Sequence, residues 1–303
     1  MKTAILIMAH DQPKHLGELV KFLNCDWTRI FIHIDRKVDI TEFQKYIPEE
    51  DGIIFLDNAF RINVNWGGFS QVKAMLNLLQ ISLDFGEQFD RFCFLSGSDY
   101  PIKSLGEINS AFDSKKEFMS IERRLDVSIN DSHYKNIRYF HFLDSPILMS
   151  MNRLIKKITG VEPKIRRKTY KKNHLYHGSA YWSLTADCVK YIFDFLQVNK
   201  DYIRFHRFTS SSDEIFFHSI VKNSHFAENL SQDFEKNDRF DMDNIRGCHY
   251  IDWNAKGVPL PKVLDLSDKN NLLQSTALFA RKFREGTSDE LLSLVQKAIN
   301  LNE

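Results

Sequence analysis

The first hundred residues alternate short apolar runs with amphipathic segments, and this alternation limits the possible folds more than any other feature of the sequence. Apolar runs at residues 4–8, 30–34, 53–56 and 92–95 have the length of buried strands. Between them, apolar residues recur at helical spacing over residues 16–23, after Pro13, and over residues 72–79. Such alternation indicates a mostly parallel, Rossmann-like sheet flanked by helices. The sequence therefore predicts an α/β fold.

Polar side chains follow three of the predicted strands at the point where each strand ends. His10 and Asp11 follow the first strand, Asp35 closes the second, and Ser96-Gly97-Ser98-Asp99 follows the fourth. Ligands of open parallel sheets bind beyond the carboxyl ends of the strands. We therefore expect the ligand site at this edge.

After about residue 118 the alternation loosens. The patterns there predict helices over residues 146–158, 186–196 and 291–301, a strand over 180–184, and a helix that begins at 211–214. The chain shows no internal repeat, low-complexity tract or flexible linker. We therefore expect one compact unit over residues 1–303.

Composition narrows the possible partners and location. The 41 Lys and Arg residues against 40 Asp and Glu leave a formal charge of +1, which does not favour a nucleic-acid partner. The apolar run near the N-terminus is too short for a signal peptide or a membrane span. The four cysteines lack metal-ligand spacing, and without export they should be reduced thiols. These features together predict a cytoplasmic protein.

Seven short motifs follow one another along the chain. They read IMAH (residues 7–10), HIDRK (33–37), WGGFSQV (66–72), LSGSDYPIK (95–103), GSAYW (178–182), SDE (212–214) and LFARKF (278–283). In this order and spacing, the series resembles the family of core-2/I-branching β-1,6-N-acetylglucosaminyltransferases and peptide O-xylosyltransferases. The resemblance extends from about residue 3 to about residue 284.

The resemblance implies a GT-A fold and an inverting transfer from a UDP-sugar. Residues 1 to about 120 would form the nucleotide-binding half, and about 121–303 the acceptor-binding half with a C-terminal diphosphate-binding element. Inversion by a single in-line displacement needs one carboxylate to accept the proton of the acceptor hydroxyl. The family's base corresponds to Glu214. Ser212 stands where the family often has proline, and both residues suit a helix start. A helix N-terminus would favour the ionised carboxylate of Glu214; the alternative is that Asp213 and Glu214 only complement the helix dipole.

The resemblance also implies that no metal is needed. Most GT-A enzymes bind a metal through an Asp-x-Asp motif, but residues 96–99 contain only one carboxylate, that of Asp99. Family members neutralise the diphosphate with C-terminal cations instead, and Lys282 matches the family's lysine. For the second cation, three candidates stay open: Arg246, His249 and Arg281. A literal Asp-x-Asp at Asp241 and Asp243 lies far from the early strands, and a metal-dependent transferase that uses it is an alternative.

Further site residues are assigned through the resemblance. Asp35 would accept hydrogen bonds from the uridine, and His10 would lie beside it. Trp66 would stack on uracil. Gly67 and Ser70 would bind the nucleotide in the same loop. The alternative for Trp66 is a core aromatic under a turn. His33 would either contact the ligand or be a buried histidine that is hydrogen-bonded within the strand. Sugar contacts are expected from Asp99, Glu122 and Trp182, the last as a stacking wall.

Residues 147–172 combine an apolar stripe with a basic stretch. Nine Lys and Arg residues between 153 and 172 are offset only by Glu162. A basic amphipathic helix can lie on an anionic membrane, so we expect peripheral contact with the inner face of the membrane; the alternative is a solvated loop beside a helix that packs on the core.

The expected function is transfer of N-acetylglucosamine or xylose to a glycan or lipid-linked glycan, in synthesis of a surface polysaccharide or lipopolysaccharide. An oxidoreductase would need a GxGxxG turn after the first strand, which AHDQP at residues 9–13 does not provide. A relative that binds nucleotide or glycan without catalysis is a second alternative, although Glu214 and Lys282 are both present.

Overall fold

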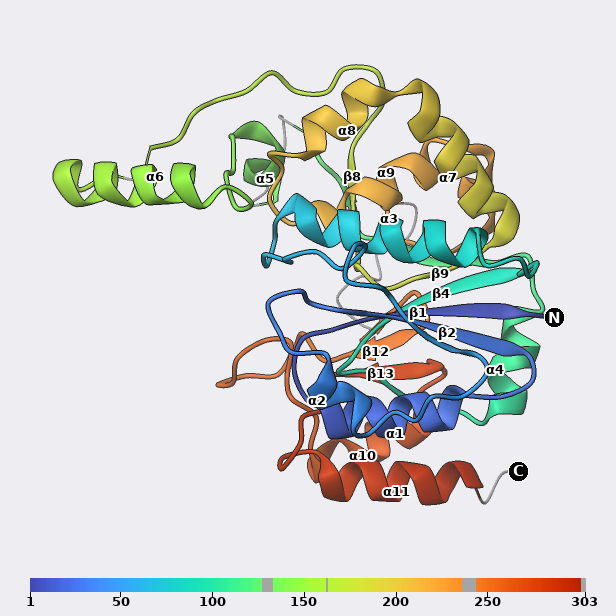
Figure 1. Cartoon of the computed structure of the whole chain (residues 1–303). Helices are drawn as coiled ribbons and strands as arrows, with labels where there is room; N and C mark the ends of the chain where they lie inside the picture. Colours follow the sequence, from blue (N-terminus) through green and yellow to red (C-terminus); the bar gives the residue numbers. More distant parts are fainter. Residues whose placement is uncertain (127–132, 162, 236–243, 301–303) are drawn as a thin grey trace.

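A seven-stranded sheet forms the centre of the computed structural model, which describes residues 1–126, 133–161, 163–235 and 244–300 (Figure 1). In spatial order β10–β6–β9–β4–β1–β2–β3, its strands are β10 (Leu230–Asp233), β6 (Glu117–Ile121), β9 (Ser183–Thr185), β4 (Arg91–Ser96), β1 (Thr3–Ala9), β2 (Thr28–Ile34) and β3 (Ile53–Phe55). β9 runs antiparallel to its neighbours, and the other pairs are parallel. The predicted α/β class and mostly parallel sheet are confirmed.

Helices cover both faces of this sheet (Figure 1). One face carries α3 (Phe69–Leu83), α7 (Ala186–Val198), α8 (Lys200–His206) and α9 (Phe216–Lys222). The other carries α1 (Pro13–Leu23), α2 (Thr41–Gln44), α4 (Leu105–Phe112), α10 (Lys269–Gln274) and α11 (Asp289–Asn300). The helices expected around residues 16–23, 72–79, 186–196 and 291–301 are confirmed within the described residues.

A smaller sheet brings the C-terminal part of the chain to the end of β4. Its order is β11 (Ile245–Arg246), β12 (His249–Ile251), β13 (Phe279–Arg281) and β5 (Tyr100–Pro101). β13 pairs antiparallel with β5, which begins four residues after β4 ends. A third pair joins β7 (Arg123–Arg124) to β8 (Tyr176–His177). Pairing of distant segments thus gathers residues from both halves of the sequence.

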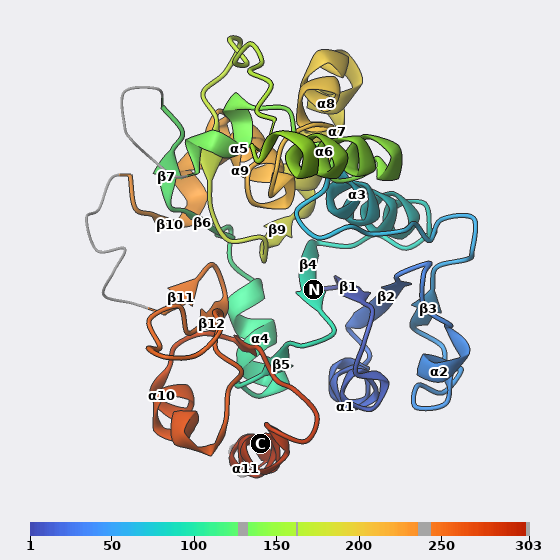
Figure 2. The same cartoon turned by 90° about the vertical axis from the view of Figure 1, so that its left-hand side faces the viewer.

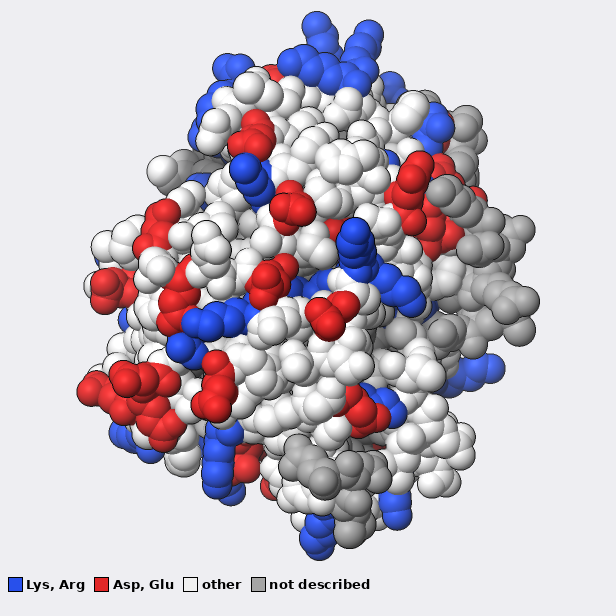
Figure 3. Space-filling view, turned by 90° about the vertical axis from the view of Figure 1, so that its right-hand side faces the viewer, with Lys and Arg blue, Asp and Glu red and all other residues white. Residues whose placement is uncertain are grey.

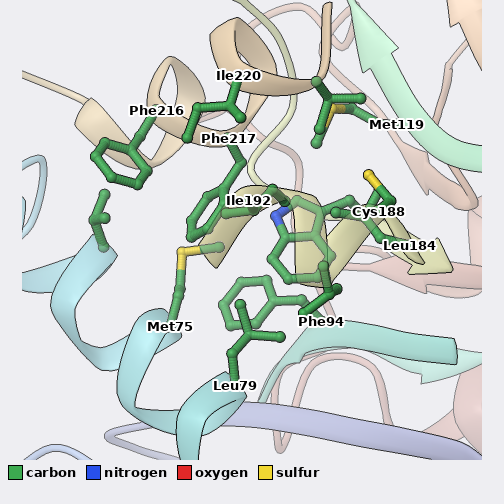
Figure 4. Packing of buried hydrophobic residues seen from close by; sticks show 14 of the residues in the cluster. Met75, Leu79, Phe94, Met119, Leu184, Cys188, Ile192, Phe216, Phe217 and Ile220 are labelled. Carbon is green, nitrogen blue, oxygen red and sulfur yellow. The ribbon is translucent and has the colours of Figure 1, made fainter. Parts of the chain in front are cut away.

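Two apolar cores fill the space between the sheet and its helices. On the α3 side, Met75 and Leu79 pack with Phe94 of β4 and with Phe217 and Ile192 (Figure 4). Burying one such side chain contributes roughly 1.5–3 kcal/mol. The close packing of this core fixes β4 and α9 relative to each other, and both elements adjoin the candidate site.

Trp182 belongs to this core, which corrects its predicted role. Its side chain is 0% exposed, and its indole lies against the rings of Phe94 (5.6 Å between centroids) and Phe217 (5.3 Å). A ring enclosed in this way cannot form a wall for a sugar. The strand expected from residue 180 also starts later, at Ser183.

The segment that contains Glu214 is a 3₁₀ turn rather than the first turn of an α-helix. The turn η1 spans Ser212–Glu214, and α9 begins only at Phe216. Ser211, which precedes it, has a φ of 48°, in the left-handed region that non-glycine residues rarely adopt. The prediction that Glu214 lies in the first turn of a helix is therefore wrong, because the 3₁₀ turn ends before α9 begins.

Helix α6 (Pro146–Thr159) stands away from the body of the molecule, beyond the short α5 (Tyr134–Arg138) (Figures 1 and 2). Proline at its start, a Ser145 side-chain cap and Gly160 at its end, with φ 71°, define its bounds. The predicted helix is confirmed. None of its residues is buried, so the alternative of a helix packed on the core is wrong.

Candidate active site

The first part of the candidate site lies where the order of strands reverses. The chain passes from β1 to β2 and β3 on one side and then returns to β4 on the other side of β1. His10 and Asp11 follow β1 at this point, and the His10 side chain is 72% exposed. Gly97 donates its N–H to the carbonyl of Met8 at 2.8 Å, and a Cβ at Gly97 would come within 2.7 Å of the Ala9 Cβ. Glycine is therefore required for this close approach, at the place where ligands of such sheets bind.

Hydrogen bonds hold the segment after β13 next to the ends of β1 and β4. Phe283 donates its N–H to the carbonyl of Ser98 at 2.8 Å, and the Gln12 side chain donates to the Phe283 carbonyl at 3.3 Å. Gln12 also accepts from the N–H of Glu285 at 2.8 Å, and its own φ is 58°. These contacts hold Lys282 beside the end of β1.

Lys282 is half-buried, and its ammonium has no hydrogen bond or ion pair with any residue that the structure describes. Burial lowers its pKa, as do the charges of Arg281 and Arg284, against the opposing effect of Asp11. A partly desolvated cation without a partner is suited to an anionic ligand.

Arg281 and His249, two candidates for the second cation, instead converge on Asp99. The Arg281 Nε lies 3.7 Å from Asp99 Oδ1, and its guanidinium lies 3.9 Å from the centroid of the Tyr181 ring. His249 Nε2 is 3.3 Å from Asp99 Oδ2, and both of these side chains are 0% exposed. Asp99 also accepts from Ser96 N at 2.8 Å and Ser96 Oγ at 2.7 Å. The prediction that Asp99 contacts a sugar is wrong for this arrangement, because its carboxylate is enclosed and already paired.

The second part of the site lies at the end of β2. Asp35 is buried there and accepts from the N–H of Lys37 at 2.9 Å. The Lys37 ammonium lies 3.4 Å from Asp35 Oδ2 and donates to the Val64 carbonyl at 2.5 Å. This places the loop that contains Trp66 next to the end of the strand. Trp66 is 90% exposed, so the alternative of a core aromatic is wrong.

His33, by contrast, has the internal role that was its alternative. It is buried, and its Nε2 accepts from the N–H of Ile62 at 3.0 Å. Burial lowers its pKa to about 4, so the imidazole is neutral. The residue supports the Trp66 loop and has no need of a ligand.

Asp144 fixes the Trp66 loop from the far side, and this explains Ser70. The Ser70 hydroxyl donates to Asp144 Oδ1 at 2.6 Å, and the Ser70 N–H donates to Asp144 Oδ2 at 2.8 Å. The same hydroxyl accepts from Asn65 N at 2.8 Å. Ser70 was predicted to contact the nucleotide; the structure instead uses its hydroxyl to shape the loop. Gly67, with φ 71°, accepts through its carbonyl from Ser211 N at 2.8 Å, so the loop also touches the segment before Glu214.

Glu214 is the end of a chain of charged side chains. His177 Nε2 donates to Glu214 Oε2 at 3.1 Å, and His177 Nδ1 donates to Glu122 Oε2 at 3.0 Å. The Arg246 Nε lies 3.4 Å from Glu122 Oε1. The Glu214 side chain is 32% exposed, against 7% for His177 and 10% for Glu122. Glu214 is therefore the member of this chain that solvent or a substrate can reach.

The roles predicted for Arg246 and Glu122, the buried members of this series, are both wrong for this arrangement. Arg246, predicted as a cation for the diphosphate, is 4% exposed at its side chain and pairs with Glu122. Glu122, predicted to bind acceptor hydroxyls, uses both carboxylate oxygens on His177 and Arg246. Burial and pairing across distant strands explain both differences.

His177 carries a positive charge at neutral pH. Burial would lower its pKa, but the hydrogen bonds to Glu122 and Glu214 and the charges of both carboxylates raise it to about 9. An imidazolium donates from both ring nitrogens, which matches the two carboxylates on either side. His177 was not among the predicted site residues; its position directly before Gly178 of the GSAYW motif was the available signal.

Asp213, next to Glu214, is in a different state. Its carboxyl is buried and accepts from Gln71 Nε2 at 3.0 Å. Burial raises its pKa, and so does the charge of Glu214. The two adjacent carboxyls are thus distinguished by their surroundings: Asp213 is internal, while Glu214 is partly exposed.

The model of the core-2/I-branching enzyme family matches residues 4–270. The chain belongs to this family. The matched residues include the ends of β1, β2 and β4 and the four linked side chains of Glu214, His177, Glu122 and Arg246. Lys282 lies beyond the matched residues.

Curated relatives of this core-2/I-branching family member are named for different sugars. It is 24% identical over 281 residues to a β-glucuronosyltransferase of Arabidopsis thaliana, covering 88% of this chain and 58% of the relative. It is 26% identical over 309 residues to xylosyltransferase 2 of Canis lupus familiaris, covering 97% and 33%. A Bos taurus β-1,6-N-acetylglucosaminyltransferase is 24% identical over 307 residues, covering 92% and 65%. The chain thus spans less than two thirds of the length of each of these relatives.

Proposed function

We propose that this chain is an inverting, metal-independent glycosyltransferase of the GT-A type that moves a sugar from a UDP-sugar to a glycan hydroxyl. The observation that carries the proposal is Glu214, whose Oε2 is held by His177 while the side chain stays 32% exposed. Among the described residues, its Oε1 has no hydrogen-bond donor. A fixed carboxylate with one open oxygen suits a general base.

In the proposed reaction, the acceptor hydroxyl gives its proton to Glu214 as its oxygen bonds to the anomeric carbon. The bond from that carbon to the UDP oxygen breaks on the opposite face, so the configuration inverts and UDP leaves with the electron pair. Lys282 would offset the charge that develops on the diphosphate. Asp35, His10, Trp66 and Gly67 would hold the uridine at the ends of β1 and β2.

Support for metal independence comes from the pairing of Asp99. Its carboxylate is already bound by Ser96, His249 and Arg281. Within the described ranges, no three His, Cys, Asp or Glu side chains are grouped so as to hold a metal ion. Asp241 and Asp243, the metal-dependent alternative, lie outside the described residues.

We expect transfer to survive chelation. Activity measured in EDTA should equal activity in buffer, because Lys282, and not a metal ion, is proposed to offset the charge that develops on the diphosphate. Loss of transfer in EDTA with recovery on adding Mn²⁺ or Mg²⁺ would contradict this and return attention to Asp241 and Asp243.

His177→Gln should lower turnover about 10- to 100-fold and leave UDP binding unchanged. The substitution removes a charge-assisted hydrogen bond, of roughly 1.5–3 kcal/mol, that orients Glu214. The native histidine keeps its charge until the pH rises through about 9, whereas in the unfolded chain it loses the charge near pH 6.5. Wild-type turnover should therefore fall as pH passes about 9. The stability that the raised pKa contributes should be complete below about pH 6.5 and be lost as pH rises to about 9. The measurement is kcat against pH for both proteins.

The pH profile separates this role from a general structural one. The variant should lack the alkaline fall that the wild type shows near pH 9, although its turnover is lower throughout. If His177→Gln retains both wild-type turnover and the alkaline fall, His177 does not position the base.

The sugar can be found by a screen of UDP-sugars for hydrolysis and transfer, with EDTA present. We propose N-acetylglucosamine or xylose as donor sugar, and the named relatives make UDP-glucuronate a third candidate. Binding of UDP without turnover of any of these donors would favour the alternative of a non-catalytic relative.

We further propose that the acceptor is a glycan, free or linked to a lipid, in the synthesis of a surface polysaccharide or lipopolysaccharide. Such an enzyme would work in the cytoplasm at the inner face of the membrane. The support is helix α6, whose apolar and basic side chains are exposed.

A further inference from the structure

Helix α6 exposes an apolar face that no described part of the chain covers. Five residues spaced by three or four positions form this face, and their exposed fractions are 75% for Ile147, 52% for Met151, 58% for Leu154, 40% for Ile155 and 74% for Ile158. At 100° per residue, these positions lie within about a third of the helix circumference. An apolar face of this kind normally marks a contact surface.

Basic residues flank this face, both on the helix and after it. On α6, Lys157 lies beside this face and Arg153 lies further round the helix, and both are exposed. Lys164, Arg166, Lys168 and Lys171 follow in the exposed segment beyond the helix. Two members of the predicted basic stretch have other roles. Arg167 donates to the carbonyls of Ile137 and Phe205 at 2.7 Å, and Lys172 pairs with Asp201 at 2.9 Å. The remaining cations are exposed and are concentrated on α6 and in the segment that follows it.

This concentration is not a property of the whole molecule. The face on the far side from α6 carries Lys and Arg interspersed with Asp and Glu (Figure 3). The formal charge of the chain is only +1. A partner selected by charge would therefore approach the α6 side.

The root of α6 is joined to the candidate site. Asp144, two residues before Pro146, holds Ser70 and Asn65 of the Trp66 loop through hydrogen bonds of 2.6–3.1 Å. The parallel strands run from the N-terminus at the right of Figure 1 toward the side from which α6 projects, and Figure 2 views that side directly. Whatever binds α6 thus lies on the side of the strand ends.

We propose that α6 and the basic segment after it dock on a lipid surface that carries anionic headgroups. The apolar face would enter the boundary between headgroups and acyl chains, and the cations would contact the headgroups. The helix has 14 residues, about 21 Å at 1.5 Å per residue, so it lies along the surface. No helix within the described ranges is long and apolar enough to cross a membrane.

Sedimentation with lipid vesicles tests this docking, with the full chain and without any substrate. We expect binding to vesicles of phosphatidylcholine with about one third phosphatidylglycerol, weak binding to pure phosphatidylcholine, and a decrease with salt. Arg153→Glu with Lys157→Glu should raise the half-saturating lipid concentration at least about 20-fold, since each cation near an anionic surface contributes about fivefold. Ile147→Ser with Ile158→Ser should weaken binding at least about tenfold.

The matched control reverses two exposed lysines elsewhere, Lys269→Glu with Lys297→Glu, on α10 and α11. It makes the same change in net charge and should alter binding less than about twofold. Equal losses in both charge-reversed proteins, or no binding of the wild type to anionic vesicles, would overturn the proposal. So would a wild-type dimer that Ile147→Ser with Ile158→Ser converts to monomer while vesicle binding persists, because the face would then bind a second copy.

This docking can be judged separately from the proposed transfer. Vesicle binding needs no turnover, so it can fail while transfer to a soluble acceptor succeeds, or the reverse. Since α6 contains no buried residue, all four α6 substitutions should leave the thermal unfolding temperature and UDP binding unchanged.

Discussion

Glu214→Gln should abolish most transfer while the protein stays folded and still binds UDP. Removing a well-placed general base costs on the order of 10²–10⁴-fold in rate. Glutamine has the size of glutamate, and its carbonyl oxygen can still accept from His177 Nε2, now 3.1 Å from Glu214 Oε2. It cannot take the acceptor proton. The measurement is steady-state transfer at saturating donor, with calorimetry to follow UDP binding.

Asp213→Asn is the control for this substitution. Asp213 is the adjacent carboxyl, it is buried, and it accepts a hydrogen bond from Gln71 at 3.0 Å that asparagine can also accept. We expect its turnover to stay within about tenfold of wild type, because the raised pKa of Asp213 already reduces its charge. Near-normal turnover of Glu214→Gln, or a greater loss in Asp213→Asn, would remove Glu214 from the role of base.

The strands and most helices could be predicted because their signals are local. β1, β2 and β4 are continuous apolar runs buried on both faces, and α3 and α7 carry helical periodicity. The 3₁₀ turn at Ser212–Glu214 could not be predicted in this way. Its form depends on tertiary contacts, including the bond from Ser211 N to the Gly67 carbonyl.

The predicted site residues divide according to how far along the sequence the contacts of their side chains lie. His10, Asp35, Trp66 and Lys282 lie at strand ends or in loops next to them, so position along the chain was enough to predict where they lie, while their roles stay predictions. Trp182, Asp99, Ser70 and Arg246 also stand in or near motifs, but their side chains pair inside the molecule. A motif identifies the residue, whereas the direction of its side chain depends on partners far away in sequence. Arg246 and its partner Glu122, for example, are 124 positions apart.

His177 illustrates the same limit for a site residue that was not predicted. Its function in the site depends on Glu122, which is 55 positions away, and on Glu214, which is 37 positions away. No spacing rule connects the three. β7 and β8 bring them together by pairing Arg123 with His177, and the close approach behind them requires Gly178, where a Cβ would overlap the Ser120 carbonyl.

Lys282→Ala should lower turnover about 100-fold and weaken UDP binding about tenfold. The Lys282 ammonium is half-buried at the reversal of strand order and has no partner among the described residues. A cation that faces the diphosphate gains charge-assisted hydrogen bonds that strengthen as the leaving oxygen takes on charge. Turnover should therefore suffer more than ground-state binding, since only interactions stronger in the transition state accelerate the reaction. Calorimetry with UDP and steady-state rates provide the two values.

The neighbouring arginines separate this role from a general need for positive charge. Arg284→Ala removes an exposed cation two positions away and should have a smaller effect on both quantities. Arg281→Ala should act mainly on folding, because it leaves the enclosed Asp99 without the guanidinium at 3.7 Å. Its unfolding temperature should fall, while the folded fraction keeps more turnover than Lys282→Ala. Were Arg281→Ala to lose turnover at normal stability while Lys282→Ala behaved as wild type, Arg281 would be the cation that contacts the diphosphate, and the assignment of Lys282 would be off by one residue.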